Sequence, residues 1–315
     1  MRDLRIVFMG TPDFAVGILQ KLVEGDKNIV GVITAPDKPA GRGRKLMQSA
    51  VKKYSISQGL KILQPPNLKN EEFLIQLKSL NANLQIIVAF RMLPKVVWAM
   101  PNYGTFNLHA SLLPKYRGAA PINWAIINGE SKTGVTTFFI DENIDTGEII
   151  AKSEIEIETN ETVGTLHDKL MELGSDLVIL TVELIEQDNI QTKLQLTNAA
   201  LKEAPKLTSE NTRIDWTATA EEIDAFIRGL SPYPVAWSIL ENDGEEMKVK
   251  IYAATIENES HTNGIGEIFT TKKKMRVAIK SGYLNIKEIQ LPGKRKMEVS
   301  ALLNGYSFNT NAKLL

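Results

Sequence analysis

Short β-branched runs alternate with helical patterns through the first half of the chain, and this alternation is the feature that most restricts the fold. The runs at 5–10 and 29–35 both end in turn residues, and a helical pattern at 14–25 separates them. A second helical pattern, at 69–80, precedes an apolar run at 84–90. Apolar strands that alternate with helices are typical of a parallel sheet that is covered on both faces. The sequence therefore predicts an α/β, Rossmann-like domain.

The same alternation continues towards the middle of the chain. Residues 106–109 and 134–140 have the composition of strands, and the segment near 121–128 between them has the composition of a helix. An extended segment at 148–157 then precedes a long helical pattern at 162–187. The predicted domain therefore extends to about residue 189.

The sequence changes character after this point. Residues 190–205 lack a sustained period and are expected to form a linker. A helical pattern at 219–230 follows, and strand-like runs then recur at roughly even spacing between Gly and Asn turns, at 249–256, 266–271, 275–282 and 283–291. Such spacing predicts a small β-barrel. We expect two domains, 1–189 and 206–315, joined by the linker.

Composition narrows the class of protein. The chain has 315 residues, enough for two buried cores, and it contains no cysteine. Disulfides, thiolate catalysis and cysteine-ligated metals are therefore excluded. No apolar run approaches the roughly 20 residues of a membrane span, and the N-terminus lacks a signal-peptide pattern. We expect a cytoplasmic enzyme that does not enter a membrane.

The formal net charge of zero conceals two basic regions. Between Thr34 and Lys53 there are six Lys and Arg residues and one acid, Asp37. From Met247 to the end of the chain, twelve Lys and Arg residues accompany five Asp and Glu residues. Concentrated positive charge on a neutral protein indicates a polyanionic partner that is bound at specific places.

The segment GTPDF, which follows the first predicted strand, invites comparison with a dinucleotide-binding fingerprint. A single glycine, Gly10, followed by Pro12 does not supply the pattern G-x-G-x-x-G. We interpret the segment as a tight turn from strand to helix, which argues against an NAD-dependent enzyme.

Two side chains with catalytic potential occur in the strand predicted at 106–109. Asn107 and His109 are two residues apart, so their side chains project from the same face where the strand ends. Open α/β sheets bind ligands at the carboxyl ends of their strands. An Asn amide can donate a hydrogen bond to a developing oxyanion, and His can move a proton near neutral pH. The pair is a candidate catalytic site, with a purely structural histidine as the alternative.

Four carboxylates in the loop 141–148 are candidates to support that histidine. Such a group would orient the imidazole and stabilise its protonated form, as in proton-relay triads, and the candidates are Asp141, Glu142, Asp145 and Glu148. The residues alone do not choose among the four, and a merely solvated acidic turn is the alternative. A metal site has less support, because His109, His167 and His261 share no ligand spacing.

Residues 35–52 form a long segment rich in Pro, Gly and positive charge. Its two prolines and two glycines prevent a continuous helix through its first part. Long loops in compact domains are commonly functional, and Arg and Lys on such a segment suit the capture of phosphates or unpaired bases. A solvated surface loop is the alternative.

Taken together, these motifs resemble those of the methionyl-tRNA formyltransferase family. They occur in matching order along nearly the whole chain: GTPDF, PDKPAGRGRKL, FNLHASLLPKYRGAAPINWAI, TGVTTFFIDENIDTGEII and RIDW. The central motifs are shared with other formyltransferases that use 10-formyltetrahydrofolate, whereas the PAGRG loop and the C-terminal domain distinguish the tRNA enzymes. The resemblance implies a Rossmann-like catalytic domain at 1–189 and an OB-like, tRNA-binding barrel at 206–315.

The resemblance also implies roles for individual residues. It places the catalytic trio at Asn107, His109 and Asp145, and the folate site at Ser111, Leu112, Leu113 and Pro114. It implies contacts with tRNA at Lys38, Arg42, Arg44, Lys45 and Lys206. One departure from the family pattern is VAFRMLP (88–94), which is one residue shorter than the corresponding stretch along the pterin pocket and has Arg91 where many relatives have Gly.

The implied reaction moves the formyl group of 10-formyltetrahydrofolate to the amino group of methionine on initiator methionyl-tRNA. It is expected to need no metal and to be carried out by a monomer. Asn107 and protonated His109 would donate hydrogen bonds to the oxygen that becomes negative, while Asp145 would hold His109. Two alternatives remain open: formyl transfer to a small amine, such as a nucleotide precursor or an amino sugar, and an RNA-binding module without catalysis.

Overall fold

The chain forms two compact units. A computed structural model describes residues 1–40, 45–196 and 201–315. Unit 1 consists of Met1–Gly118, Thr133–Ile155 and His167–Glu203. Unit 2 consists of Ala119–Lys132, Glu156–Leu166 and Ala204–Leu315. Unit 2 thus takes in two segments that precede the linker expected at 190–205.

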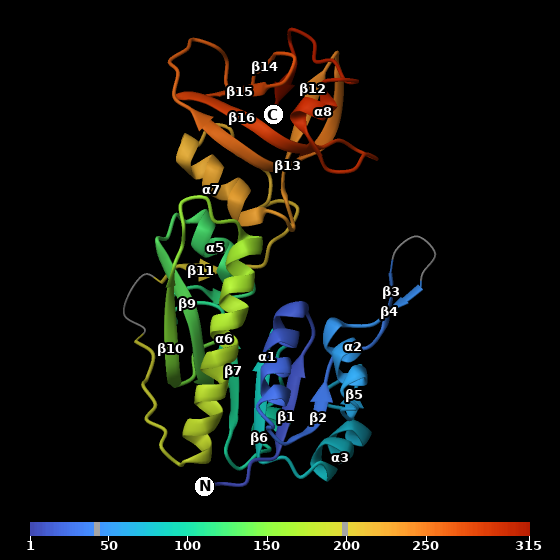
Figure 1. Cartoon of the computed structure of the whole chain (residues 1–315), viewed down its shortest axis with the longest axis vertical. Coiled ribbons are helices and arrows are strands. Elements are labelled where there is room, and N and C mark those ends of the chain that lie inside the picture. The colour runs from blue at the N-terminus through green and yellow to red at the C-terminus, as the bar shows by residue number, and fades with distance from the viewer. Residues whose placement is uncertain (41–44, 197–200) are drawn as a thin grey trace. The chain divides into compact units, whose positions relative to one another are not determined.

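Unit 1 is built on a seven-stranded sheet, which Figure 1 shows with helices packed against it. The strand order is β10-β9-β7-β6-β1-β2-β5. The bounds are β1 Ile6–Gly10, β2 Ile29–Ile33, β5 Ile62–Leu63, β6 Leu84–Val88, β7 Thr105–His109, β9 Lys132–Phe139 and β10 Ile149–Glu156. The predicted α/β, Rossmann-like domain is confirmed.

The sheet is not parallel throughout, which corrects the sequence expectation. The strands β5, β2, β1, β6 and β7 pair in parallel, but β9 runs antiparallel to β7, with His109 opposite Thr136 and Phe106 opposite Phe139. Mixed sheets, in which a mostly parallel sheet includes an antiparallel strand, are common in α/β folds. Hydrophobic composition does not encode strand direction, so the sequence could not reveal it.

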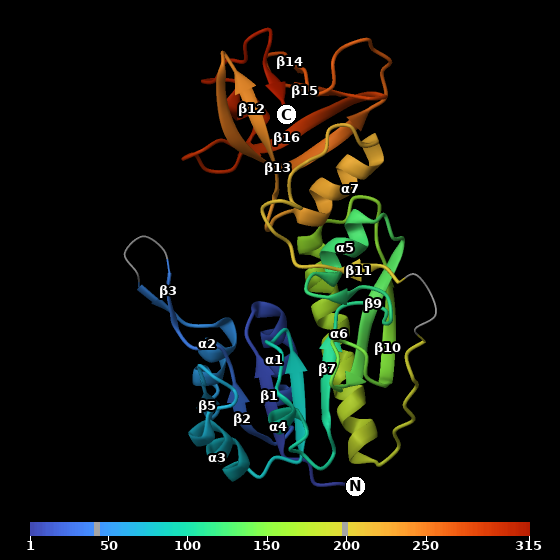
Figure 2. The same cartoon turned by 180° about the vertical axis from the view of Figure 1, so that it is seen from behind.

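Helices cover both faces of this sheet, as expected (Figure 2). They are α1 Asp13–Glu24, α2 Ala50–Ser57, α3 Glu71–Ser79, α4 Lys95–Trp98 and α6 Val163–Glu186. Side chains of α3 and α4 share one apolar core with Val7 and Met9 of β1. Gly10 packs closely on Ala15 of α1, and Gly174 of α6 packs closely on Leu108 of β7. Side chains alternate between the two faces along a strand, so Gly10 and its ladder neighbour Leu108 face away from the core that contains Val7 and Met9. Helices α1 and α6 therefore lie on the face of the sheet opposite to α3 and α4.

Two of these helices were not expected. Residues 35–52, which the sequence analysis interpreted as a long loop, end in α2. The N-cap of this helix, Ser49, accepts a hydrogen bond from the Lys52 amide. The first part of that segment forms a hairpin of β3 (Lys38–Ala40) and β4 (Lys45–Met47), here called the arm (Figure 1). The other unexpected helix is α4, which begins after Pro94.

Unit 2 contains the expected antiparallel barrel. Its sheet has the order β14-β15-β16-β13-β12-β18, and β17 pairs with β16. The strand bounds are β12 Ala236–Asn242, β13 Glu245–Glu257, β14 Ile268–Thr270, β15 Met275–Ile279, β16 Gly282–Gln290, β17 Met297–Glu298 and β18 Lys313–Leu314. Glu267 also pairs with Lys313, which connects the two ends of the sheet into a nearly closed barrel.

Three helices belong to unit 2: α5 Pro121–Ile127, α7 Ala220–Leu230 and the short α8 Val299–Leu302. A capping box between Thr219 and Glu222 begins α7, as the [ST]-x-x-E pattern favours. Gly229 of α7 allows a close approach to α5, because an added Cβ would lie 2.6 Å from Ile127 Cγ1. This contact places α5 in unit 2.

The remaining short strands are β8 (Arg117–Gly118) and β11 (Glu203–Ala204). None of the helices that the structure describes combines the length and the apolar character that a membrane span needs.

Candidate active site

The candidate site begins where β7 ends. Asn107 is half-buried and pairs with Ile87 in the parallel ladder between β6 and β7. Its side-chain amide makes no hydrogen bond to any described residue, although its neighbours on the strand are buried. A side-chain amide in this position can both donate and accept. Asn107 therefore offers an amide that is fixed by its strand and available to a ligand.

His109 lies two residues further along the same strand face and is 6% exposed. Its Nε2 lies 2.8 Å from the carbonyl oxygen of Tyr116. A carbonyl only accepts, so Nε2 carries the hydrogen in this contact and fixes the tautomer. Its Nδ1 lies 3.8 Å from Oδ2 of Asp145. The atom of His109 that can gain or lose a proton is therefore Nδ1, which faces a carboxylate.

Asp145 is the acid in the turn 141–147 that lies beside His109. Its carboxylate is 16% exposed, and Oδ2 accepts a hydrogen bond of 3.0 Å from the Gly118 amide. The other three acids have different partners: Asp141 accepts from Asn143 and Thr146, Glu142 pairs with Lys95, and Glu148 accepts from Thr192. Geometry therefore distinguishes Asp145 among the four carboxylates that the sequence left open.

Asp145 reaches His109 by a route that the sequence did not indicate. Because β9 is antiparallel, the turn after it leaves the sheet next to Phe106, at the start of β7. Within the turn, Asp145 has φ +56°, in the left-handed region that Asp tolerates better than most residues. Gly147 packs so tightly that an added Cβ would lie 1.7 Å from the Phe139 carbonyl oxygen. This backbone path therefore requires glycine at 147 and suits aspartate at 145.

Gln195 is a site residue that sequence reasoning missed. Its Nε2 donates to the carbonyl oxygens of both Asp145 and Gly147, at 2.9 Å each. Its Oε1 accepts from the Arg117 guanidinium at 2.7 and 3.2 Å. Gln195 occurs in an aperiodic segment, 50 residues from Asp145, so no local pattern could have indicated it.

The segment SLLP is anchored in the interior of unit 1. Ser111 and Leu113 are fully buried, whereas Leu112 and Pro114 are half-buried. Ser111 Oγ donates to the Lys115 carbonyl, and the Leu113 amide donates to Thr136 Oγ1. This segment can therefore meet a ligand through its backbone and through Leu112 and Pro114.

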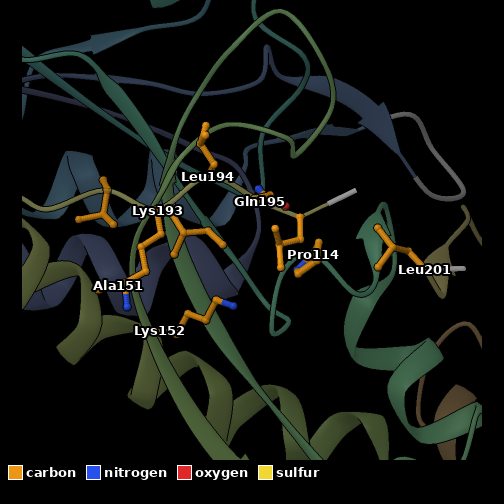
Figure 3. A pocket seen from close by; sticks show the side chains of 10 residues that line it. Pro114, Ala151, Lys152, Lys193, Leu194, Gln195 and Leu201 are labelled. Carbon is orange, nitrogen blue, oxygen red and sulfur yellow. The ribbon is translucent and has the colours of Figure 1, made fainter. Parts of the chain in front are cut away.

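A cavity of about 650 Å³ is lined in part by Pro114, at the end of this segment (Figure 3). Residues of β10 and of 193–196 form most of its largely apolar lining, together with Pro114 and Leu201. Lys152 Nζ, at its edge, donates to the Leu113 carbonyl oxygen. Desolvation lowers the pKa of Lys152, since burial disfavours a charged ammonium.

The departure at 88–94 has a simple structural consequence. Arg91 donates to the carbonyl oxygens of Pro65 and Pro66 and lies over the Phe90 ring. Burial lowers the pKa of this guanidinium. Arg91 thus joins its own segment to the one after β5 through a hydrogen bond from each of its two terminal nitrogens to backbone.

The residues expected to contact tRNA are only partly described. Lys38 of the arm is exposed, and its side chain has no hydrogen bond or ion pair with a described residue. Arg42, Arg44 and the side chain of Lys45 lie outside the described residues. Lys206 is also exposed.

The other two histidines have partners of their own. His167 contacts Asp168 and the ring of Phe14, while His261 contacts the Gly282 carbonyl and the Tyr283 ring. Within the described ranges, no cluster of three or more His, Asp or Glu side chains could hold a metal ion.

Comparison with known proteins places the chain in a family. The model described as "Formyl transferase" matches residues 4–182, and "Formyl transferase, C-terminal domain" matches residues 206–307. A methionyl-tRNA formyltransferase of Flavobacterium johnsoniae is 59% identical over 314 residues, which covers 100% of both chains. The chain belongs to the methionyl-tRNA formyltransferase family.

Other relatives in this family cover the chain almost as fully. The methionyl-tRNA formyltransferase of Bacteroides fragilis is 52% identical over 317 residues, covering 99% of this chain and 98% of the relative. The family resemblance inferred from the sequence motifs is thus confirmed.

Solved structures show the same fold at low identity. An N-formyltransferase from Helicobacter canadensis, in complex with folinic acid and dTDP-3-aminofucose, has a TM-score of 0.65 at 22% identity. That match covers 90% of this chain and 98% of the other. HypX from Aquifex aeolicus, in complex with tetrahydrofolic acid, has a TM-score of 0.65 at 18% identity, over 96% of this chain and 47% of that one.

Proposed function

We propose that this chain transfers the formyl group of 10-formyltetrahydrofolate to the amino group of methionine on initiator methionyl-tRNA. The observation that carries the proposal is full-length similarity to methionyl-tRNA formyltransferases, together with an unpaired Asn107 amide next to the His109–Asp145 pair. In this reaction the methionine nitrogen bonds to the formyl carbon, and the bond from that carbon to the folate nitrogen breaks. The amine loses a proton, and the folate nitrogen gains one.

Asn107 would stabilise the charge that develops on the formyl oxygen. Its amide has no competing partner among the described residues, and the ladder to Ile87 holds its backbone. Removal of one such donor typically slows acyl transfer by roughly 100-fold to 1,000-fold. We therefore assign the oxyanion contact to Asn107.

His109 would move the proton through Nδ1. Its Nε2 is engaged by the Tyr116 carbonyl, so Nδ1 is the atom that accepts the amine proton and returns a proton to the folate nitrogen. Asp145, 3.8 Å away, would stabilise the imidazolium formed in between. The sequence analysis assigned His109 a hydrogen bond to the oxyanion as well. Here we assign the oxyanion contact to Asn107 and the proton transfer to His109.

The folate substrate would lie against the backbone of Ser111–Pro114, with Leu112 and Pro114 as apolar contacts. The buried Ser111 and Leu113 side chains would hold that backbone in place. We propose no metal in the reaction, since amide, imidazole and carboxylate supply the electrostatic and proton-transfer functions.

Recognition of tRNA would use positive charge at several places. We propose that Lys38, Arg42, Arg44 and Lys45 of the arm and Lys206 contact the acceptor end. Lys38 and Lys206 are exposed, as phosphate contacts require. We retain 1–189 as the catalytic domain, 190–205 as the linker and 206–315 as the tRNA-binding domain, in a cytoplasmic monomer.

One assay tests the acceptor. The protein is incubated with 10-formyltetrahydrofolate and with charged initiator tRNA, charged elongator tRNA or an amino sugar nucleotide. We expect formylation of the initiator methionyl-tRNA at a rate well above that of the other acceptors. The N-formyltransferase from Helicobacter canadensis, solved with dTDP-3-aminofucose, makes the amino sugar the relevant competitor. Preferred formylation of the sugar, or of neither class, would overturn the proposal.

A further inference from the structure

Gln195 makes four hydrogen bonds that together join two backbone segments. Its amide orientation is fixed by chemistry: the carbonyl oxygens of Asp145 and Gly147 only accept, and the Arg117 guanidinium only donates. The side chain is half-buried, so these bonds compete with water less than surface bonds do. Gln195 therefore links the acidic turn to Arg117, through its amide nitrogen on one side and its amide oxygen on the other.

Both segments that Gln195 joins hold the candidate catalytic side chains. The Tyr116 carbonyl accepts from His109, and the Gly118 amide donates to the Asp145 carboxylate. Arg117, which Gln195 holds, lies between these two residues. The backbone bonds from Gln195 go to Asp145 itself and to Gly147. Gln195 thus contacts the backbone of the turn that carries Asp145. It also contacts Arg117, whose two sequence neighbours bind His109 and Asp145.

The segment that carries Gln195 is itself fixed beside the turn. The backbones of Lys193 and Ile149 exchange two hydrogen bonds, of 2.8 and 2.9 Å. Thr192 donates to Glu148, the residue that follows Gly147. The chain from 192 to 195 therefore runs alongside residues 145–149, which gives Gln195 a defined starting point.

We propose that Gln195 is a positioning residue, which holds the left-handed Asp145 turn so that the carboxylate faces His109. The inference rests on the proposed function of Asp145 and assigns its support to a residue of the linker. Asp145 at φ +56° is in a sparsely populated conformation, which persists only when surrounding contacts determine it. Gln195 supplies two of those contacts at the backbone, independently of the bond from Gly118 to the carboxylate.

The test compares Gln195→Leu with Gln191→Leu in single-turnover formylation of charged initiator tRNA. Gln191 is a glutamine of the same linker, exposed and without a hydrogen bond to any described residue. We expect Gln195→Leu to slow the chemical step by roughly 10-fold to 100-fold, with little change in KM for 10-formyltetrahydrofolate when this is measured separately at steady state. Gln191→Leu should match the wild type, and thermal unfolding should confirm that both variants fold.

A second variant distinguishes the bonds that Gln195 makes to the turn from those that it makes to Arg117. Gln195→Glu keeps an acceptor for Arg117 but loses the donor and turns a carboxylate towards the carbonyls of Asp145 and Gly147. We expect it to be as slow as Gln195→Leu. A wild-type rate for Gln195→Glu would show that the bonds to the turn do not matter, and would overturn the inference.

A double-mutant cycle distinguishes positioning from general stability. If Gln195 acts through Asp145, Gln195→Leu should change the rate less than about 2-fold in an Asp145→Ala background. An equal loss in both backgrounds would overturn the inference and leave the role of Asp145 intact. A wild-type rate for Asp145→Ala alone would instead overturn the proposed role of Asp145, and the inference with it.

Discussion

Two charged segments leave the sheet of unit 1, and they differ in how their charges are engaged. In the acidic turn 141–147, each of the three carboxylates has a partner, and Gly147 fits tightly against Phe139. In the arm, Lys38 is exposed and its side chain contacts no described residue through a hydrogen bond or ion pair. The arm is fixed at its base instead, where Asp37 binds Lys52 and Gln64.

The difference corresponds to two tasks. Groups that stabilise a transition state must already be in place, because reorganisation during the reaction adds to the barrier. Groups that capture a polyanion act through charge and do not need a fixed position. We therefore expect substitutions in the turn to affect the chemical step, and substitutions in the arm to affect the capture of tRNA.

The largest combined effect on stability and activity is expected for Gly147→Ala. A methyl group there would lie 1.7 Å from the Phe139 carbonyl oxygen, so the backbone of the turn must shift. We expect a loss of about 1–3 kcal/mol in the free energy of unfolding, and a formylation rate lower by roughly 100-fold. Denaturant unfolding and single-turnover assays measure the two quantities.

The matched control for this change is Gly305→Ala, where an added Cβ meets no atom within 4 Å. It should leave both quantities unchanged. If Gly147→Ala also left the free energy of unfolding and the formylation rate unchanged, the turn would not need its tight backbone path.

A smaller effect is expected when low pH protonates Asp37, at the base of the arm. Hydrogen bonds from Gln64 and Lys52 hold the pKa of Asp37 below its usual value. A lowered pKa in the folded state means that the stabilisation is present above the usual carboxyl range and is lost as pH falls through the lowered value. Exchange of the amide hydrogens of Ala35, Asp37, Lys38 and Ala40 should therefore accelerate below about pH 4, after correction for intrinsic exchange.

Asp37→Asn should show the faster exchange already at neutral pH, with little further change in acid. Asp3→Asn, at an exposed carboxylate without a side-chain partner among the described residues, is the control and should behave like the wild type. Unchanged exchange in Asp37→Asn would mean that this contact does not fix the arm.

The smallest effect is expected for Lys38→Ala. Stability should change by no more than about 0.5 kcal/mol, because the side chain is exposed and unpaired within the described residues. The affinity for charged tRNA should fall, and the slope of log K against log salt should decrease by about 0.7–0.9 for one lost phosphate contact. A filter-binding titration at several salt concentrations measures that slope, and an unchanged slope would remove Lys38 from the tRNA contacts.

The parts of this molecule that the sequence predicted correctly depend on local patterns. The runs around β1, β2 and β6 and the helical periods of α1 and α3 indicated the α/β layers, and evenly spaced strands indicated the barrel. The same-face relation of Asn107 and His109 follows from the two-residue period of a strand.

The parts that were missed depend on contacts between residues far apart in the chain. The antiparallel direction of β9 is set by pairing with β7, not by its own composition. Gln195 lies in a segment without periodicity, and its partners Arg117 and Asp145 are 78 and 50 residues away. Likewise, α5 joins unit 2 because Gly229, 102 positions beyond Ile127, leaves space for it. Arg91 was seen as a departure, but its bonds to Pro65 and Pro66 could not be read from its own segment.

The central claim is that the Asp145 charge beside His109 is needed for formyl transfer, and Asp145→Asn tests it most directly. Asparagine keeps an oxygen that can accept from the Gly118 amide but removes the charge. Glu142→Gln, in the same turn and paired with Lys95 at the surface, is the control. We predict that single-turnover formylation falls by at least roughly 100-fold in Asp145→Asn and stays within about 3-fold of wild type in Glu142→Gln. Equal rates in the two folded variants would contradict the account.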